Sequence, residues 1–328
     1  MRRICSVLLS FALLFPAWSR RDSPAPIFET STPAKSTQAP AEGALISAAD
    51  GGALVIPYTK KRRLSYAGYL ITIEHKRVNV EGFSPDNEVA VVKKNGRILG
   101  VFDAVRNPLG AFTRLALVSL LGDREKQLVI EQTGPREWAH WIVALKPRFH
   151  VVFDNLHYPV DHELGIEDRD GDGVPEVLTT LSTFWFFDGL CGACSPRFTI
   201  AFKYDRQRSV FWPANHLVKG LCDSRDELIE AERKIKAWQR KNPDYGSDPI
   251  KASDLYSKVL IHSLPLIYCG NGSLGWSFFD RLYNLPDRAV RKLRIKRALR
   301  SDRVFRLIQN DLTRTRRDAS LYRARLSD

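Results

Sequence analysis

Short apolar runs separated by turn residues make up most of the chain from about residue 44 to residue 212. The runs are rich in β-branched and aromatic residues, which is typical of strands. Asn95-Gly96 lies between two of them and predicts a hairpin turn. No segment of helical length and period interrupts the runs, so neighbouring strands are expected to pair antiparallel. We expect strands in YLITIEHKRVNVEGF (two), EVAVVKKNGRILGVF, RLALVSL, QLVIEQ, WAHWIVAL, FHVVF, EVLTTLSTFWFF, FTIAFKYD and SVFW.

Near residue 222 the apolar pattern changes to a helical period. Ser224 and Glu227 have the spacing of a capping box, which marks the start of a helix. One face of that helix carries Leu228, Ala231, Ile235 and Trp238. About five helices are expected over residues 222–312, followed by a frayed tail. The sequence therefore predicts an α+β protein, with an antiparallel β-rich domain at 44–221, an all-helical C-terminal domain at 222–313 and a basic tail at 314–328.

A weak internal repeat runs through the β-rich half. The segment GDGVPEVLTT aligns with GDREKQLVIE, so that Glu176 corresponds to Gln127. Glu88 stands in a similar turn-then-strand segment, 39 residues before Gln127. Spacings of about 40–50 residues with several strands each predict propeller-like units. Only about three units can be counted, so an incomplete propeller, an open stack of sheets and a closed ring all remain open, as does chance similarity among hairpins.

Four carboxylates stand within the nine residues from Asp168 to Glu176. Like charges this close repel one another, so a cation among them is the natural interpretation. Calcium takes six to eight oxygen ligands, and the absence of His and Cys from this segment disfavours zinc and copper. Magnesium is less suited to an all-protein site. The alternatives are another ion or a solvated acidic turn, because Asp and Gly are also common turn residues.

An EF-hand does not explain this segment. Counting from Asp168, the position of the bidentate glutamate is occupied by Thr179, and the following EVLTTLSTFWFF predicts a strand where a helix is required. The run Asp168-Arg-Asp-Gly-Asp-Gly-Val-Pro-Glu176 instead resembles the calcium loop of FG-GAP/VCBS repeats, which build integrin-like β-propellers. The resemblance covers one clear repeat loop of about ten residues. It implies the calcium ligands Asp168, Asp170, Asp172, Val174 and Glu176, and it implies no ion at Gly122-Asp123, where the first two aspartates are missing.

The N-terminus predicts export. Arg2 and Arg3 precede an apolar run from Ile4 to Trp18, which is shorter than the roughly 20 residues of a membrane span. A signal peptide at 1–19 is expected, with an uncleaved anchor as the alternative. The Pro-, Ser- and Thr-rich segment 20–43 reads as a disordered linker. The protein is thus expected in the periplasm, at the cell surface or outside the cell.

Removing Cys5 with the signal leaves Cys191, Cys194, Cys222 and Cys269. An even number of cysteines in an oxidising compartment predicts disulfides. Of the three pairings, the sequence favours Cys191–Cys194 with Cys222–Cys269. A redox role for Cys191-Gly-Ala-Cys194 would require a helix start in a βαβ setting, whereas this motif lies between strand-like runs.

The formal charge of +13 is concentrated at the chain ends. Residues 287–328 hold 14 Lys and Arg against 5 Asp and Glu, whereas the body between residues 23 and 286 is almost neutral. This distribution argues against a nucleic-acid-binding body. The segment 287–328 could contact anionic surfaces, although its pattern also fits an ordinary amphipathic helix.

Catalysis has no positive support in the motifs. The chain has no G-x-S-x-G, H-E-x-x-H or phosphate-binding glycine loop. His157 and His162 flank a turn but are most simply surface residues. The expected function is a non-catalytic calcium-binding module of the cell envelope or surface, with an unknown protein or polysaccharide ligand. The alternatives are an exported hydrolase or thiol oxidoreductase, and a membrane-surface or polyanion-associated protein acting through its Arg-rich C-terminus.

Overall fold

The computed structural model describes residues 46–47, 54–77, 86–104, 111–134, 138–218 and 220–327, and all of them belong to one compact unit. The side chains of residues 46–47, 54–55, 77, 86, 161–163 and 316–327 are not among those described. The signal peptide at 1–19 and the linker at 20–43 therefore lie outside the described residues, as does the side chain of His162.

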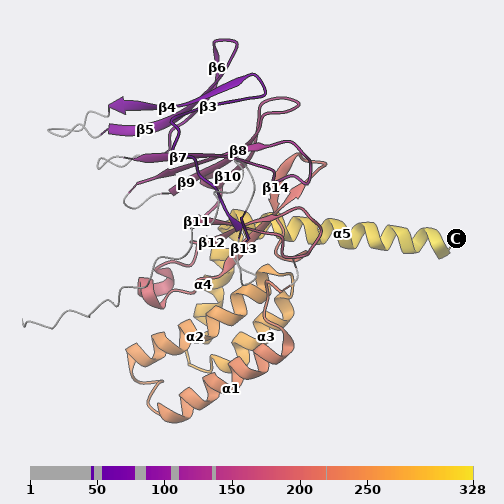
Figure 1. Ribbon diagram of the computed structural model, residues 1–328. Coiled ribbons are helices and arrows are strands. Elements are labelled where there is room, and N and C mark those ends of the chain that lie inside the picture. The colour runs from indigo at the N-terminus through magenta and orange to yellow at the C-terminus, as the bar shows by residue number, and fades with distance from the viewer. Residues whose placement is uncertain are drawn as a thin grey trace, which may run out of the picture. The chain divides into compact units, whose positions relative to one another are not determined.

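Three antiparallel sheets follow one another along the chain, each built from four consecutive strands (Figure 1). Two short strands, β1 (Ile46–Ser47) and β2 (Leu54–Val55), extend the edge of the third sheet beside β11. The first sheet is β3 (Arg63–Tyr66), β4 (Tyr69–Arg77), β5 (Asp86–Lys94) and β6 (Arg97–Phe102). The second is β7 (Phe112–Val118), β8 (Gln127–Thr133), β9 (Trp138–Ala144) and β10 (His150–Asp154). The third is β11 (Val160–Glu167), β12 (Glu176–Leu181), β13 (Thr199–Asp205) and β14 (Val210–Pro213).

The middle sheet is buried on both faces. Successive residues of a strand point to opposite faces, and on β8 Leu128 and Ile130 join the core of the first sheet with Ile71. Val129, between them, joins the core of the third sheet with Phe202. Burial on both faces explains why the polar residues of β8 are covered as well, and only Thr133 at its end is not fully buried. The sheets thus stack in a propeller-like manner, and over the described residues they do not close into a ring.

The internal repeat is visible as a structural correspondence between the second and third sheets. Gln127 begins β8 and accepts a hydrogen bond from the backbone N–H of Leu120, seven residues earlier (2.6 Å). Glu176 begins β12 and accepts one from Arg169, again seven residues earlier (2.8 Å). The proposed third member, Glu88, does not correspond, because it lies near the start of the third strand of its sheet, not the second.

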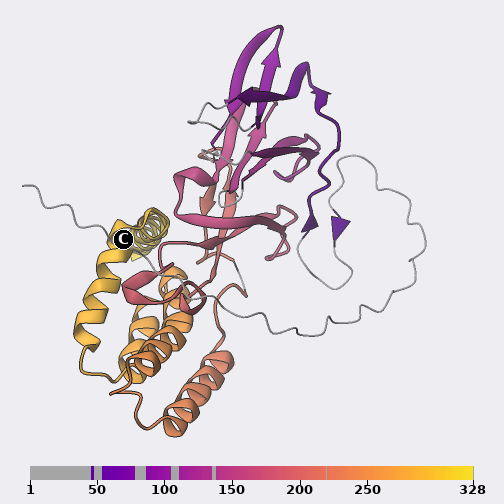
Figure 2. The ribbon, with the colours of Figure 1, turned by 90° about the vertical axis from the view of Figure 1, so that its left-hand side faces the viewer.

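Five helices follow the sheets (Figure 2). The capping box predicted at the first helix is formed, with the Ser224 hydroxyl accepting from the Glu227 N–H and the Glu227 carboxylate accepting from the Ser224 N–H. The helices are α1 (Arg225–Lys241), α2 (Pro249–Tyr268), α3 (Gly272–Leu282), α4 (Arg288–Ser301) and α5 (Arg303–Ser327).

Some local expectations were wrong. Of the two strands expected from Tyr69 onward, the first is present as β4, and the second falls in residues 78–85, outside the described residues. The strand expected over 176–187 ends at Leu181, because the chain turns into a loop held by hydrogen bonds to other elements. The tail expected to fray is helical to Ser327, since it is rich in good helix formers and has no Gly or Pro.

Candidate metal centre

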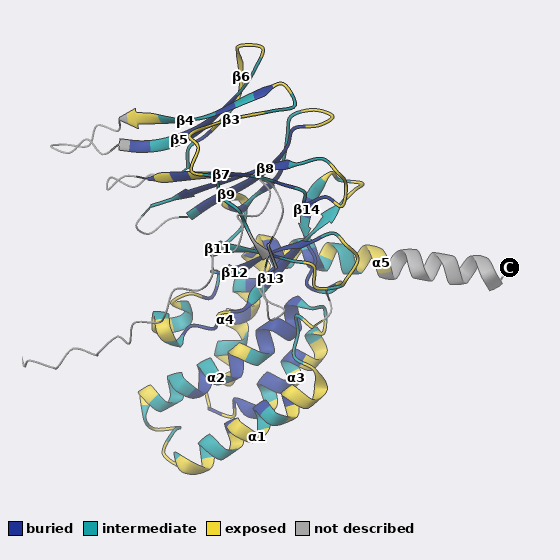
Figure 3. Ribbon diagram, viewed as in Figure 1, coloured by how far each residue is buried: buried dark blue, intermediate teal, exposed yellow. Residues whose placement is uncertain are grey.

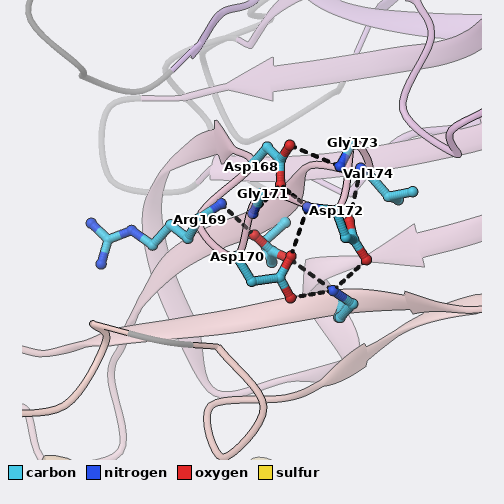
Figure 4. A network of polar contacts seen from close by, with 9 residues as sticks. Asp168, Arg169, Asp170, Gly171, Asp172, Gly173 and Val174 are labelled. Carbon is cyan, nitrogen blue, oxygen red and sulfur yellow. Dashed lines mark hydrogen bonds and ion pairs between the residues drawn. The ribbon is translucent and has the colours of Figure 1, made fainter.

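The acidic segment forms a tight loop between β11 and β12 (Figure 4). Gly171 and Gly173 have φ values of +74° and +81°, a region that side chains rarely adopt. These two glycines let the backbone reverse within a few residues. The aspartates are thereby brought to one side of the loop.

Asp168 organises the backbone of this loop. Its carboxylate accepts hydrogen bonds from the N–H groups of Gly171 (3.0 Å), Asp172 (3.1 Å) and Gly173 (2.9 Å). Asp172 accepts a further bond from the N–H of Val174 (2.9 Å). The aspartate side chains thus fix the backbone of their own loop through hydrogen bonds. Each carboxylate has further lone pairs that do not accept these hydrogen bonds, and those remain available to a cation.

Three of the expected ligands converge. One carboxylate oxygen from each of Asp168, Asp170 and Glu176 lies within 4.8 Å of the others, so this triad could hold a metal ion. Glu176 is fully buried at the start of β12. Asp172 lies outside this triad, with its side chain 45% exposed. Val174 directs its side chain toward Gly122 in the corresponding loop of the second sheet, where a β-carbon would come within 2.6 Å of it.

A lysine that the sequence reasoning did not find completes the cluster. The ammonium group of Lys203, on β13, contacts Asp170, lies 2.8 Å from the carboxylate of Asp172 and lies 3.4 Å from that of Glu176. Val177 pairs with Phe202, and continuing this register places Lys203 across from Glu176. The register between β12 and β13 cannot be read from the sequence, so no local signal links this lysine to the loop.

The charges of the cluster are strongly coupled. Burial opposes the charge of Lys203, but hydrogen bonds to Asp170 and Asp172 outweigh it and raise the Lys203 pKa above its ordinary value. The Lys203 ammonium in turn lowers the pKa of Asp172. Burial raises the pKa of Glu176. The loop is therefore a receptor for positive charge, and in this conformation an amino group of the chain supplies that charge.

The donor set fits a hard cation. All the side-chain donors are carboxylate oxygens, which suit calcium and not zinc or copper. An ion bound to Asp170, Asp172 and Glu176 would compete with Lys203 for the same oxygens. Lys203 is 23% exposed, so its flexible stem has a route toward solvent when an ion replaces it.

The cysteines pair at disulfide distance as the sequence favoured. The Cα atoms of Cys191 and Cys194 are 5.0 Å apart, and those of Cys222 and Cys269 are 6.5 Å apart. Cys191 is exposed and precedes a 3₁₀ helix of only three residues, Gly192–Cys194. A single turn has little dipole to lower a thiol pKa, so this geometry lacks the helix start of redox motifs.

Among the described residues, histidines line two of the cavities. A cavity of about 480 Å³ is lined by residues that include His157, whose side chain is 65% exposed and lies 3.5 Å from Asp154. A second cavity, of about 560 Å³, lies between α1 and α2 and contains His262, 2.7 Å from Asp223. No serine, threonine or cysteine is among the residues that line either cavity, so neither histidine has a nucleophile of this type beside it.

Comparisons with protein-family models, with curated proteins and with solved structures find no match. Within the described ranges no helix is both long enough and apolar enough to cross a bilayer.

Proposed function

We propose that this chain is an exported, non-catalytic protein whose third sheet carries a structural calcium loop, and that it serves as a binding or structural module of the cell envelope or surface. The observation that carries the proposal is the loop at 168–176, where one oxygen each of Asp168, Asp170 and Glu176 converge. Two of these carboxylates, together with that of Asp172, also surround the ammonium group of Lys203. The resemblance of this loop to FG-GAP/VCBS repeats supports calcium as the ion. Paired cysteines and the N-terminal apolar segment support export.

The proposed role of calcium is to fix the contact between two sheets. Val174 of the loop packs toward Gly122, in the equivalent loop of the second sheet. An ion that rigidifies residues 168–176 would hold Val174 in place and so stabilise the stacking of the sheets. Nothing in this arrangement requires an open coordination position, which is why we assign the ion to structure and not to catalysis.

Calcium binding is tested by calorimetry and thermal melts on the chain from residue 20 onward, which retains every described residue. We expect heat of binding and a melting temperature several degrees higher in calcium than in chelator, because a ligand that binds only the folded state stabilises it by about 2.7 kcal/mol at a hundred times its dissociation constant. Asp170→Ala should abolish both effects.

Asp123→Ala is the matched control, since Asp123 lies in the equivalent loop of the second sheet and is not among the clustered acids. It should bind calcium as the parent chain does. A folded parent chain that gives no heat and no shift in melting temperature would refute the calcium assignment. A response to zinc or magnesium alone would replace calcium by that ion.

A further inference from the structure

The loop at Ser182–Pro196, which we call the aromatic loop, exposes two large aromatic side chains. Trp185 is 39% exposed and Phe186 is 65% exposed. Their rings stack, with centroids 5.7 Å apart and planes inclined by 27°. Figure 3 shows exposed residues on this loop, which lies beside α4 in the views of Figures 1 and 2. Most apolar side chains of this size are buried, so a stacked pair at the surface requires an explanation.

The backbone holds Phe186 in an unfavourable conformation. Its φ is +53°, in the left-handed region that bulky residues avoid. The Phe186 N–H donates to the Ser195 hydroxyl (2.8 Å), and that hydroxyl donates to the carbonyl of Cys191 (2.9 Å). Gly192 lies under the ring, where a β-carbon would come within 3.0 Å of it. The surrounding contacts therefore keep the aromatic pair outward against the preference of the backbone.

The aromatic loop is anchored to the helices. Asp188, whose side chain is only 4% exposed, forms ion pairs with Arg291 (2.8 Å) and Arg294 of α4. Thr183 donates to Asp302 at the start of α5, and Ser257 of α2 donates to the carbonyl of Cys194. With the cysteine pair inside it, the loop is a rigid platform and not a flexible connection.

The outer face of α4 continues this surface. Val290 is 52% exposed and Leu293 is 48% exposed. Arg294 and Arg297 are also exposed, and the four residues follow the i, i+3, i+4, i+7 spacing of one helix face. Arg294 contacts Asp188, so the stripe adjoins the aromatic loop directly. In total α4 holds seven Lys and Arg and no acidic residue.

We propose that the aromatic loop and the outer face of α4 together form a docking surface for anionic lipid bilayers. Aromatic rings on a polar scaffold partition into the headgroup region, and nearby arginines pair with anionic lipid headgroups. Stable attachment without a membrane span takes two such signals, and both are present on this surface. This inference goes beyond the calcium module and does not depend on the ion.

Charge and chemistry favour a bilayer over a neutral sugar. A sugar stacked on an aromatic ring also needs carboxylates or amides beside the ring to receive its hydroxyl groups. The only acidic residue of Ser182–Pro196 is Asp188, which is already paired with two arginines, and the segment has no Asn or Gln. Exposed apolar side chains on both the loop and α4 require a partner with an apolar interior.

Vesicle sedimentation tests the proposal with the chain from residue 20 onward. We expect binding to vesicles of phosphatidylcholine mixed with phosphatidylglycerol, weakening as salt rises, and little binding to phosphatidylcholine alone. Replacing Trp185 and Phe186 by serine should lower the partition coefficient about tenfold or more. Arg297→Gln should lower it roughly fivefold, because one basic residue near the surface contributes about that factor and this variant leaves the contact between Arg294 and Asp188 intact.

Two matched control variants distinguish binding through this surface from non-specific adsorption of the protein to vesicles. Phe112→Ser removes an aromatic that is 70% exposed on β7, and Arg240→Gln with Lys241→Gln removes two exposed cations from α1. Both should bind vesicles as the parent does. Absence of vesicle binding at low salt would overturn the proposal, as would equal losses in test and control variants. Tighter binding to a soluble acidic polysaccharide, insensitive to Trp185 and Phe186, would assign the surface to a polyanion instead.

Discussion

At the scale of a single residue, Lys203 supplies the counter-charge of the acidic loop. A loop of carboxylates without a counter-charge would be strained by repulsion, but the Lys203 ammonium contacts Asp170 and Asp172 and is attached to the chain. It therefore stabilises the loop when no ion is bound. The same contacts make it a competitor of any ion, so it should lower the affinity of the loop for calcium.

Lys203→Met separates these two effects. In chelator we expect the variant to melt at a lower temperature than the parent, because three carboxylates lose their counter-charge. In calcium we expect tighter binding, by about tenfold or more, because no ammonium has to be displaced. Calorimetry and thermal melts measure both quantities on the same samples.

Lys146→Met is the control for this comparison. Lys146 pairs with Glu125 at 3.0 Å on the surface of the second sheet, and the two side chains are 48% and 40% exposed. Its replacement should leave calcium affinity unchanged and alter stability little. If Lys203→Met binds calcium no more tightly than the parent does, competition by Lys203 is refuted, while the calcium assignment itself stands.

At this scale the sequence predicted the acidic residues but not their counter-charge. The spacing of Asp168, Asp170 and Glu176 shows that they share a loop, because all lie within a few residues of one another. Lys203 is 27 residues beyond Glu176, and it reaches the loop only through the pairing of β12 with β13. Contacts set by strand register leave no trace in local sequence patterns.

At the scale of elements, two equivalent loops precede the second strands of two sheets. Gln127 and Glu176 make the same hydrogen bond to a backbone N–H seven residues earlier. Either an amide or a carboxylate can therefore form this hydrogen bond at the first residue of the second strand. Only the third sheet combines the buried carboxylate with clustered aspartates among the described residues.

Glu176→Gln separates the effect of this carboxylate on the stability of the fold from its effect on ion binding. Burial raises the pKa of Glu176, so the folded chain binds its proton more tightly than the unfolded chain does. The stability contributed by this group is present below the unfolded pKa and is lost as pH rises through the folded pKa. In chelator at neutral pH, Glu176→Gln should therefore melt at or above the temperature of the parent, and the difference should shrink in acid.

Calcium affinity should fall at least tenfold in the same variant, because a charged ligand is lost. Melts across pH and calorimetry at neutral pH provide the measurements. Gln127→Glu, the reciprocal change, should destabilise the chain at neutral pH without creating an ion site. If Glu176→Gln were unfolded in chelator, the charge of the carboxylate would be required to maintain the loop, because glutamine has the same shape without the charge.

Local chemistry explains which elements the sequence could predict. Asn95-Gly96 and the Ser224–Glu227 capping box act within a few residues, and both formed as expected. The aromatic segment after Leu181 has a composition that suits a strand, and the sequence therefore predicts one there. Its actual course depends on partners such as Asp302, which is distant in sequence, so tertiary contacts overrode local preference.

At the scale of the whole molecule, one apolar core joins the third sheet to the helices. Phe202 and Phe211 of the sheet belong to the same cluster as Tyr268 of α2 and Val304 of α5. An ion pair between Arg208 and Asp311 (2.9 Å) connects the sheet to α5 as well. The domain boundary predicted near residue 222 is thus crossed by continuous packing, and whether each side folds alone stays a prediction.

Continuous packing predicts cooperative unfolding of β13, which Phe198 directly precedes, and α2. The ring of Tyr268 lies 5.1 Å from that of Phe198 and 5.5 Å from that of Phe305, measured between centroids. Tyr268→Ala should cost about 3–5 kcal/mol, as for other buried aromatics. Hydrogen exchange read by peptide should show β13 and α2 losing protection together, whereas the exposed control Phe112→Ala changes neither. Loss of protection in α2 alone would mean that the helices unfold separately, and an autonomous helical domain beginning near residue 222 would then follow.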